Sequence, residues 1–554
     1  MKKEEHMKKS IGFMIGFSLL AAVQAAASPI PTFDKEAVTV HPYNRTGEPD
    51  ALIDRAGADQ MYREGNTGTE ENPAFYIREI RLTGQTLPDK KGKLAEILKK
   101  YSGRNVQVSE ISSLQKEIAE YARSVGYTVP LAAVPPQEIR DGVLEIRVYL
   151  AAYDKITLEE NNTDVADSVL EKYMKYLHEG ETITDRELES VMNNINDLPG
   201  VTAAAVLEPG SEPGTTSVGI RAERRPVWNN YVFIDNGGGY YSGRYRYGFN
   251  TEINNPGHQG DKIILNGMIT SHDVENYGVR YETPVGSRGT RWGLAYSKSS
   301  YDLPTTGMYD SVGHSEGISF YGLTPLYRDR SNRVTAIYGY DRRNIKDRLR
   351  FTVDLPENLH VETNKTADVI HAGISGSQYN VNQFTQYSLI YWHGNIRTDG
   401  GGVYYDGVYH KLTGDLLNIW YDGRWNYRIS FRGQLANRAL DGSEQFYLGG
   451  INGVRAYGNS DGYGDMGYLA TGEIRYGTSV PGLELAAFTD VGAVKNRAMD
   501  TMDHLAGWGV GLRYSKNGDW YAQLDYSRKI NGRADLVESN DHSGRWWFQL
   551  YKLF

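Results

Sequence analysis

The sequence predicts two small α+β modules followed by an antiparallel transmembrane β-barrel of about 16 strands. Three observations favour this fold class: a secretory leader, a twice-repeated strand–helix–helix–strand–strand pattern, and a C-terminal half in which apolar and polar residues alternate. The chain ends in an aromatic residue, Phe554, and alternate positions before it hold Trp546, Phe548 and Leu550. Lys552 interrupts the alternation. Such a strand would seal a barrel with its aromatic face toward lipid, and the alternative is the edge strand of a soluble sheet.

Residues 1–27 have the order of a secretory signal peptide. Lysines near the start are followed by an apolar stretch from Ile11 to Ala22 and by small residues at 25–27. The apolar stretch is shorter than the ~18 residues that a retained transmembrane helix needs. We therefore expect removal of residues 1–27 on export.

The composition agrees with export to a bacterial outer membrane. The 554 residues include no cysteine, which excludes disulfides, thiolate metal sites and a cysteine nucleophile. Tyrosine (41 residues) far outnumbers phenylalanine (14 residues), as is typical of the interfacial girdles of a barrel. The mean hydropathy of −0.53 is too low for a helical membrane protein but suits a barrel, in which only alternate residues face lipid. A net charge of −9 gives no support for nucleic-acid binding.

Residues 74–151 and 152–225 are predicted to form two modules of one topology. In the first module we expect strands at Phe75–Leu82, Thr128–Val134 and Val143–Leu150, with helices at Lys93–Lys100 and Ser109–Val125. In the second we expect strands at Lys155–Leu158, Val201–Leu207 and Ser217–Ala222, with helices at Val165–Leu177 and after a capping box of Thr184 and Glu187. A shared order over about 70 to 75 residues indicates an internal repeat, and two unrelated α+β domains are the alternative.

Residues 226–554 have the pattern of the barrel. Apolar and polar side chains alternate most clearly at 245–254, 292–297 and 508–514. One glycine-rich connection, around residues 446–468, stands out because Gly449–Gly458 holds a single cation, Arg455. A strand further on carries a carboxylate, Asp490. Bidentate arginine–carboxylate pairs combine charge with fixed geometry, so we predict that Arg455 folds into the lumen and pairs with Asp490. The alternative is two unrelated charges, one in solvent and one on the inner wall.

Two short motifs give the sequence a specific resemblance. They are Val454-Arg455-Ala456-Tyr457 in the glycine-rich connection and Phe488-Thr489-Asp490-Val491-Gly492 on the later strand. With two modules before them and Phe554 after them, they resemble the outer-membrane transporters of two-partner secretion, the TpsB family. Members have a signal peptide, two POTRA domains and a 16-stranded barrel whose sixth extracellular loop inserts into the pore. The sequence departs at Ala456, where the family usually has glycine, and an alanine there would be strained if the backbone were left-handed.

The resemblance implies an outer-membrane pore, with its POTRA domains in the periplasm, that moves an unfolded exoprotein of the adhesin or cytolysin type to the cell surface without ATP. POTRA domains would bind this client, often by adding a client strand to a sheet edge. Phe554 would be the C-terminal signal for the barrel assembly machinery, and outer-membrane lipid would surround the barrel. The alternative is a factor of the same superfamily that assembles other barrels. Residues 28–73 would be an N-terminal extension holding a plug helix at 51–63 and a linker, or a disordered segment.

No catalytic residue, cofactor or metal site is expected, so the chain is not expected to be an enzyme. Gly313–Gly317 matches the G-x-S-x-G nucleophile pattern, but no helix follows it, and we expect a connecting loop. Asp461 and Asp465 lack the other ligands of a calcium loop, and we expect solvated loop carboxylates. The 12 histidines show no H-E-x-x-H spacing, and no Walker phosphate-binding motif occurs.

Overall fold

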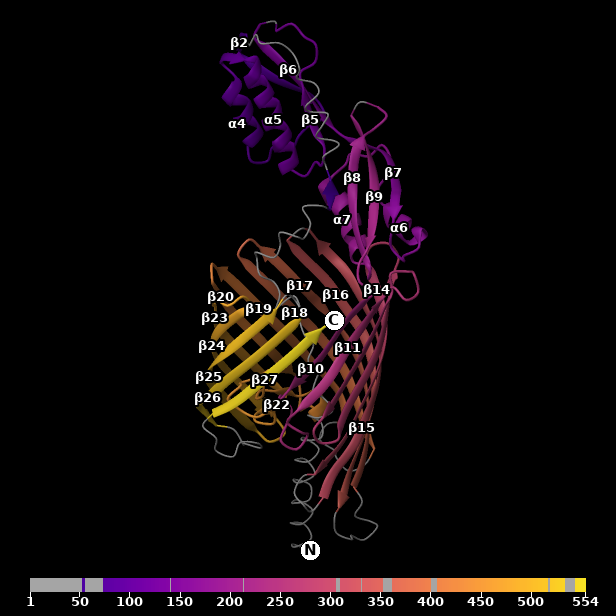
Figure 1. Ribbon diagram of the computed structural model, residues 1–554, viewed down its shortest axis with the longest axis vertical. Helices are drawn as coiled ribbons and strands as arrows, with labels where there is room; N and C mark the ends of the chain where they lie inside the picture. Colours follow the sequence, from indigo (N-terminus) through magenta and orange to yellow (C-terminus); the bar gives the residue numbers. More distant parts are fainter. Residues whose placement is uncertain are drawn as a thin grey trace.

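The computed structural model describes residues 52–54, 73–139, 141–212, 214–304, 309–329, 331–351, 361–399, 406–516, 519–533 and 544–554. The predicted signal peptide at 1–27 lies outside these residues, as do most of the predicted extension and its linker. Two α+β modules follow one another at one end of a large β-barrel (Figure 1). The fold class predicted from the sequence is therefore confirmed.

The first module places two helices against a three-stranded sheet. Its elements are β2 (Ala74–Ile77), β3 (Glu79–Gly84), α4 (Lys93–Tyr101), β4 (Arg104–Gln107), α5 (Val108–Ser124), β5 (Pro130–Ala133) and β6 (Val143–Leu150). The last strand, β6, is central, with β3 parallel on one side and β5 antiparallel on the other. The core lies between this sheet and the helices, where Leu114, Ile118 and Ile146 are fully buried.

Two strands of this module differ from the prediction. The single strand expected at Phe75–Leu82 is divided, because Ile77 and Ile80 are both buried and a continuous strand would turn them to opposite faces. The bend falls at Arg78, whose N–H donates to the carbonyl of Gly142 (2.7 Å). The strand β4 was not predicted, since only one of its four side chains is buried. Both helices lie within one residue of their predicted bounds.

The second module repeats the topology. It contains β1 (Ile53–Asp54), β7 (Ala152–Asn161), α6 (Asp167–Met174), α7 (Asp185–Asn196), β8 (Val201–Pro209) and β9 (Thr215–Arg224). The last strand is again central, with β7 parallel to β9 and β8 antiparallel to it. The capping residue Thr184 accepts the N–H of Glu187 at the start of α7 (3.4 Å). The internal repeat predicted from the order of elements is therefore present in the strand pairing.

The plug-helix expectation is wrong for the part of 51–63 that the structure describes. Ile53 and Asp54 form β1, a short strand that runs parallel to the edge strand β8. Ile53 is buried in the core of the second module, so the segment is held by sheet pairing and apolar packing. Residues 55–63 lie outside the described residues.

The barrel has sixteen strands, as the length of the C-terminal half predicts. They are β10 (Trp228–Asp235), β11 (Arg246–Asn254), β12 (Lys262–Thr270), β13 (Val274–Val285), β14 (Thr290–Pro304), β15 (Tyr309–Arg328), β16 (Asn332–Phe351), β17 (Val361–Asn380), β18 (Gln383–Asp399), β19 (Gly407–Asp422), β20 (Trp425–Ala436), β23 (Met466–Gly477), β24 (Leu483–Asn496), β25 (Thr501–Lys516), β26 (Trp520–Arg533) and β27 (Gly544–Leu553). The first barrel strand, β10, pairs antiparallel with the last, β27, and closes the barrel.

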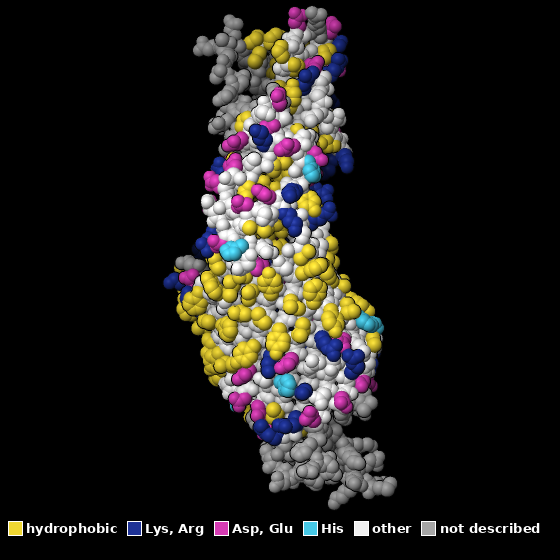
Figure 2. Space-filling model, turned by 90° about the vertical axis from the view of Figure 1, so that its right-hand side faces the viewer, with side chains coloured by type: hydrophobic (Ala, Val, Ile, Leu, Met, Phe, Trp, Pro, Cys, Tyr) yellow, Lys and Arg dark blue, Asp and Glu magenta, His cyan; other side chains and the backbone are white. Residues whose placement is uncertain are grey.

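The barrel wall alternates as predicted. Large apolar side chains such as Tyr247, Leu294 and Val510 face outward and are exposed. Their neighbours along the strands face the lumen, where Arg246 and Arg513 are buried. On the face of the barrel drawn in Figure 2, hydrophobic side chains gather in a band, and charged side chains lie above and below it. This is the surface that a lipid bilayer requires of a barrel with a polar interior.

The second module rests on the turns at one end of the barrel. Arg288, in the turn after β13, donates to the hydroxyl of Tyr176 (3.1 Å). Arg328, at the end of β15, forms an ion pair with Asp197 at the end of α7. Among the helices that the structure describes, none has the length and apolarity needed to cross a membrane.

Candidate pore-loop site

The connection between β20 and β23 folds back into the barrel. It holds a short 3₁₀ helix, η3 (Gly442–Glu444), and a small hairpin of β21 (Phe446–Tyr447) and β22 (Tyr463–Gly464). Its tip contacts Glu473, Asp490 and Asp525, which lie on three different barrel strands. On those strands the adjacent residues Ile474, Val491 and Leu524 are exposed on the outer face. Because side chains alternate across a strand, the three carboxylates face the lumen, and the loop tip lies inside it.

Arg455 is the centre of the contacts at the loop tip, and only 6% of its surface is exposed. Its Nε and Nη2 atoms donate to the two carboxylate oxygens of Asp490, each at 2.9 Å. The backbone N–H of Arg455 also donates to Asp490 (3.1 Å). The predicted pair between these residues is thus present, and it has the bidentate geometry in which arginine binds a carboxylate best.

Arg455 also contacts carboxylates that the sequence analysis did not single out. Its Nη1 atom donates to Glu473 on β23 and to Asp525 on β26, both at 3.1 Å. Arg513 on β25 binds both of these acidic residues, whereas Arg475, which lies two positions from Glu473 on β23, binds Glu473 alone of the two. Three arginines and three carboxylates therefore form one buried network, which we call the tip network. For the members of the tip network other than Arg455 and Asp490, the sequence gives one signal: each is a charged residue on the inward face of a strand.

The Phe-x-Asp-x-Gly motif of β24 places three residues on one face of the strand. Phe488, Asp490 and Gly492 are two positions apart, so all three face the lumen. The ring centroid of Phe488 lies 3.2 Å from the guanidinium carbon of Arg455, the geometry of a cation–π contact. A Cβ atom added to Gly492 would come within 2.4 Å of Leu448 in the loop. Each residue of this motif therefore contacts or makes room for the loop.

The rest of the loop motif is also buried. Val454, Ala456 and Tyr457 belong to one hydrophobic cluster formed by the loop and the wall. The φ angle of Ala456 is not positive, so an alanine at this position causes no backbone strain. The methyl group of Ala456 packs against Gly507 on β25. A Cβ atom added to Gly507 would lie 2.7 Å from the methyl carbon of Ala456. The departure from glycine is thus accommodated by an opposing glycine on β25.

Side chains from β26 and β27 also fix the backbone of the tip. The hydroxyl of Ser527 on β26 and the indole N–H of Trp547 on β27 both donate to the carbonyl of Arg455, each at 2.6 Å. The guanidinium and the backbone of one residue therefore connect β23, β24, β26 and β27.

Asp461 and Asp465 are buried, so the expectation that they are solvated is wrong. Asp461 accepts the backbone N–H of Gly458 (2.8 Å). Asp465 accepts those of Leu440 and Arg497, both at 2.7 Å. Both are fully buried because they satisfy backbone donors within a tightly folded loop, a role that a polar, glycine-rich sequence does not reveal.

A second buried network binds the base of the loop to the opposite wall, and we call it the base network. Lys365 on β17 donates to Asp441 (2.9 Å) and lies 3.4 Å from Asp347. Glu444 pairs with Lys411 on β19 (2.7 Å) and with Arg343 on β16. These residues were not predicted. The loop is consequently held at its tip by β23–β27 and at its base by β16–β19.

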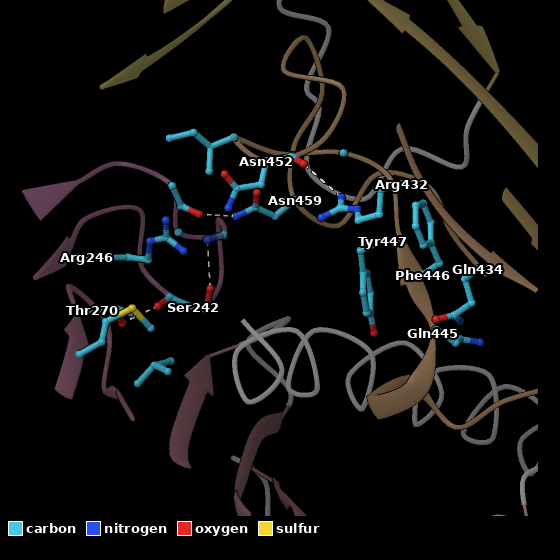
Figure 3. Close-up of a pocket in the computed structure, with 17 residues that line it drawn as sticks. Ser242, Arg246, Thr270, Arg432, Gln434, Gln445, Phe446, Tyr447, Asn452 and Asn459 are labelled. Carbon is cyan, nitrogen blue, oxygen red and sulfur yellow. Dashed lines mark hydrogen bonds between the residues drawn. The ribbon is translucent and has the colours of Figure 1, made fainter. Parts of the chain in front are cut away.

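A cavity of about 280 Å³ separates the loop from the wall formed by β10–β12. Figure 3 shows Arg246 and Thr270 on the wall side, with Asn452 and Asn459 on the loop side. The amide of Asn459 donates to the carbonyl of Gly237 (2.6 Å) and bridges the two sides.

The other sequence candidates lie away from the loop. Gly313–Gly317 forms part of the long strand β15, so the expectation of a connecting loop is wrong, and no helix follows to present its serine. The segment pairs residue by residue with β14 and so forms part of the barrel wall. No group of three or more metal-binding side chains occurs in the part of the chain that the structure describes. Phe554 lies at the end of the chain next to β27, with its side chain 71% exposed.

Comparison with known proteins identifies the family to which this barrel and its first module belong. Residues 214–514 match the family model described as haemolysin secretion/activation protein ShlB/FhaC/HecB. The chain belongs to this family. Residues 75–149 match the POTRA domain of ShlB type. The chain is therefore an outer-membrane transporter of two-partner secretion, with its POTRA domains in the periplasm.

Individual relatives span most of the chain. It is 26% identical over 492 residues to the heme/hemopexin transporter protein HuxB of Haemophilus influenzae, covering 83% of this chain and 84% of that protein. It is 23% identical over 475 residues to the outer membrane transporter CdiB of Dickeya dadantii, covering 82% of each. Among solved structures, CdiB from Escherichia coli matches with a TM-score of 0.64 at 18% identity, over 88% of this chain and 92% of that one. BamA from Haemophilus ducreyi lacking POTRA domains 1–3 matches with a TM-score of 0.52 at 14% identity, over 87% of this chain and all of that one.

Proposed function

We propose that this chain captures an unfolded exoprotein with its periplasmic POTRA modules and passes it through the barrel lumen to the cell surface. The observation that carries the proposal is the loop bound inside the lumen through Arg455. The tip network and the base network both hold this segment, so it can leave or return as a unit when both networks open. Arg455 and Asp490, at the tip, would therefore take part in controlling whether the lumen is available to the client.

The driving force would come from the client. The sequence holds no Walker motif, and we assign no nucleotide to the transport step. Folding of the client outside the cell would bury apolar surface and make its return unfavourable. We also assign no catalytic step to the chain, because its serine motif forms part of the barrel wall.

We further propose that Phe554 is the signal through which the barrel assembly machinery recognises the chain. Its exposed ring supports this role, and its backbone N–H donates to the carbonyl of Asn230 on β10 (2.9 Å), which fixes the end of the chain. The ammonium group of Lys552 lies 5.5 Å from the centroid of the ring. Removal of Phe554 should lower the amount of assembled barrel while leaving the POTRA modules folded.

The testing experiment compares proteins in the medium, on the cell surface and in the outer membrane, with and without the gene. Loss of one or two large exported proteins, restored by the wild-type gene, is the expected result. Complementation with Arg455→Ala should give assembled barrel but no export. Depletion of many outer-membrane barrels would instead assign the chain to barrel assembly, and normal export by Arg455→Ala at normal surface abundance would refute the role of the loop.

A further inference from the structure

The second module has an edge strand that the chain itself covers. In its sheet, β8 lies outside β9, and β1 pairs with the open side of β8. The register places Ile53 opposite Ala205 and Asp54 opposite Val206, and the N–H of Ala205 donates to the carbonyl of Leu52 (2.8 Å). A segment from before the first module therefore completes the sheet of the second.

This segment has one buried aliphatic anchor. Ile53 is 8% exposed and belongs to the core cluster of the second module, while Leu52 packs against that cluster. The strand covers only two register positions of β8, which is nine residues long. A longer strand that docked on the same edge could pair with more of β8, and backbone pairing rewards length without demanding a particular sequence.

The repeated topology provides an internal comparison. In the first module the corresponding strand is β5, and within the described residues it pairs only with β6. Both modules cap part of this edge with a helix amide: Gln115 donates to the carbonyl of Ala132 (3.1 Å), and Asn196 bonds both backbone groups of Ala203 (2.8 and 2.9 Å). The fold of a module therefore does not need an added strand, and β1 is a feature of the second module alone.

We propose that the β8 edge of the second module is the docking edge for an extended segment of the exported protein, and that Leu52–Asp54 is an internal placeholder which that segment displaces. The incoming strand runs parallel to β8 and puts an aliphatic side chain where Ile53 now lies. Open strand edges pair readily with any extended chain, so the placeholder also protects the edge between export events. This inference rests on the proposed function, because it identifies where the exported chain binds.

The first test locks the placeholder in place. The natural chain has no cysteine, so Asp54→Cys with Val206→Cys supplies the only thiols, at paired positions that leave Ile53 in its core site. In cells, the cross-linked transporter should export at least about tenfold less client per assembled barrel than either single variant. Wild-type export from a fully cross-linked transporter would overturn the proposal.

The second test measures the free edge directly. The probe is a fluorescent peptide with the sequence of residues 48–58, added to the full-length transporter in detergent. Ile53→Glu removes the aliphatic anchor and should bind the peptide at least about tenfold more tightly than the wild type, whereas the cross-linked double-cysteine variant should not bind it. Equal binding by all three proteins would overturn the proposal.

These outcomes separate the two proposals. If the wild-type chain exports no protein, the proposed function fails. If the wild-type chain exports its client and the cross-linked chain does so equally well, the transport function stands and only the placeholder is refuted.

Discussion

Replacing Arg455 with alanine tests whether the tip network holds the loop inside the lumen. The substitution removes four side-chain hydrogen bonds to Asp490, Glu473 and Asp525. Asp490 is only 1% exposed and would lose its positively charged partner. Its remaining hydrogen-bond donors would be uncharged: the hydroxyl of Thr471 (2.9 Å) and the backbone N–H of residue 455. Three buried carboxylates would then face two arginines. The docked loop should therefore become much less stable than the released loop.

The size of the effect follows from the burial of the pair. Removing one partner of a buried ion pair costs about 3–5 kcal/mol, because the other charge stays buried and uncompensated. Since each 1.4 kcal/mol changes an equilibrium about tenfold, the ratio of docked to released loop should fall by roughly three orders of magnitude. The barrel itself should remain closed, because its sixteen strands pair independently of the loop.

Thiol labelling can measure this ratio because the chain has no cysteine of its own. Val454→Cys introduces a thiol at a fully buried tip position next to the altered residue. With Arg455→Ala in addition, its labelling rate should rise by about three orders of magnitude, up to the rate of a free thiol. Arg455→Lys is the matched control: it keeps the charge but loses the bidentate fork, so its rate should be intermediate. A rise of less than about tenfold in a fully assembled barrel would refute the reasoning.

Three further predictions concern single contacts. Gly507→Ala should displace the loop tip and so raise the conductance of the barrel in planar bilayers. Adding Ala456→Gly should reverse the change, and an unchanged conductance in Gly507→Ala would argue against the close contact. Lys365→Met should lower the temperature at which the barrel unfolds in gel-shift assays, since two buried carboxylates lose their cation, and Asp441→Asn should recover part of the loss. Thr184→Ala should lower the free energy of unfolding of the second module by about 1 kcal/mol in urea titrations, while Thr184→Ser should be close to wild type.

The sequence predicts the architecture well because its signals are periodic and local. Alternation along Tyr245–Asn254 places Tyr247 in the lipid-facing surface and Arg246 in the lumen, as the structure has them. The helix at Ser109–Val125 is predicted to within one residue by its apolar spacing and Gly126, whose φ of +102° suits a helix end. By contrast, the two-residue strand β1 has no periodicity to detect, and its pairing with β8 depends on a contact between distant parts of the chain.

The site is predicted only at its centre. Arg455 and Asp490 could be paired because a lone cation in a glycine-rich loop needs a partner in a polar lumen. The remaining members, such as Glu473 and Asp525, come from separate strands, and the number of residues between them does not determine which strands face one another across a closed barrel. The expectation of a solvated Asp465 is wrong for a related reason, since burial of a loop carboxylate depends on the fold around it.

The pairing of β10 with β27 has a consequence for how the cell makes this protein. Tyr231 in the first barrel strand lies opposite Leu553 in the last one, so the barrel strand that is synthesised after all the other barrel strands is the one that joins the two edges. A chain shortened before β27 is an open sheet with two rows of unpaired backbone groups, each costing several kcal/mol in hydrocarbon. Prematurely ended products should therefore fail to insert and be degraded in the periplasm. The outer membrane is thus protected from leaky fragments by the topology of the barrel itself.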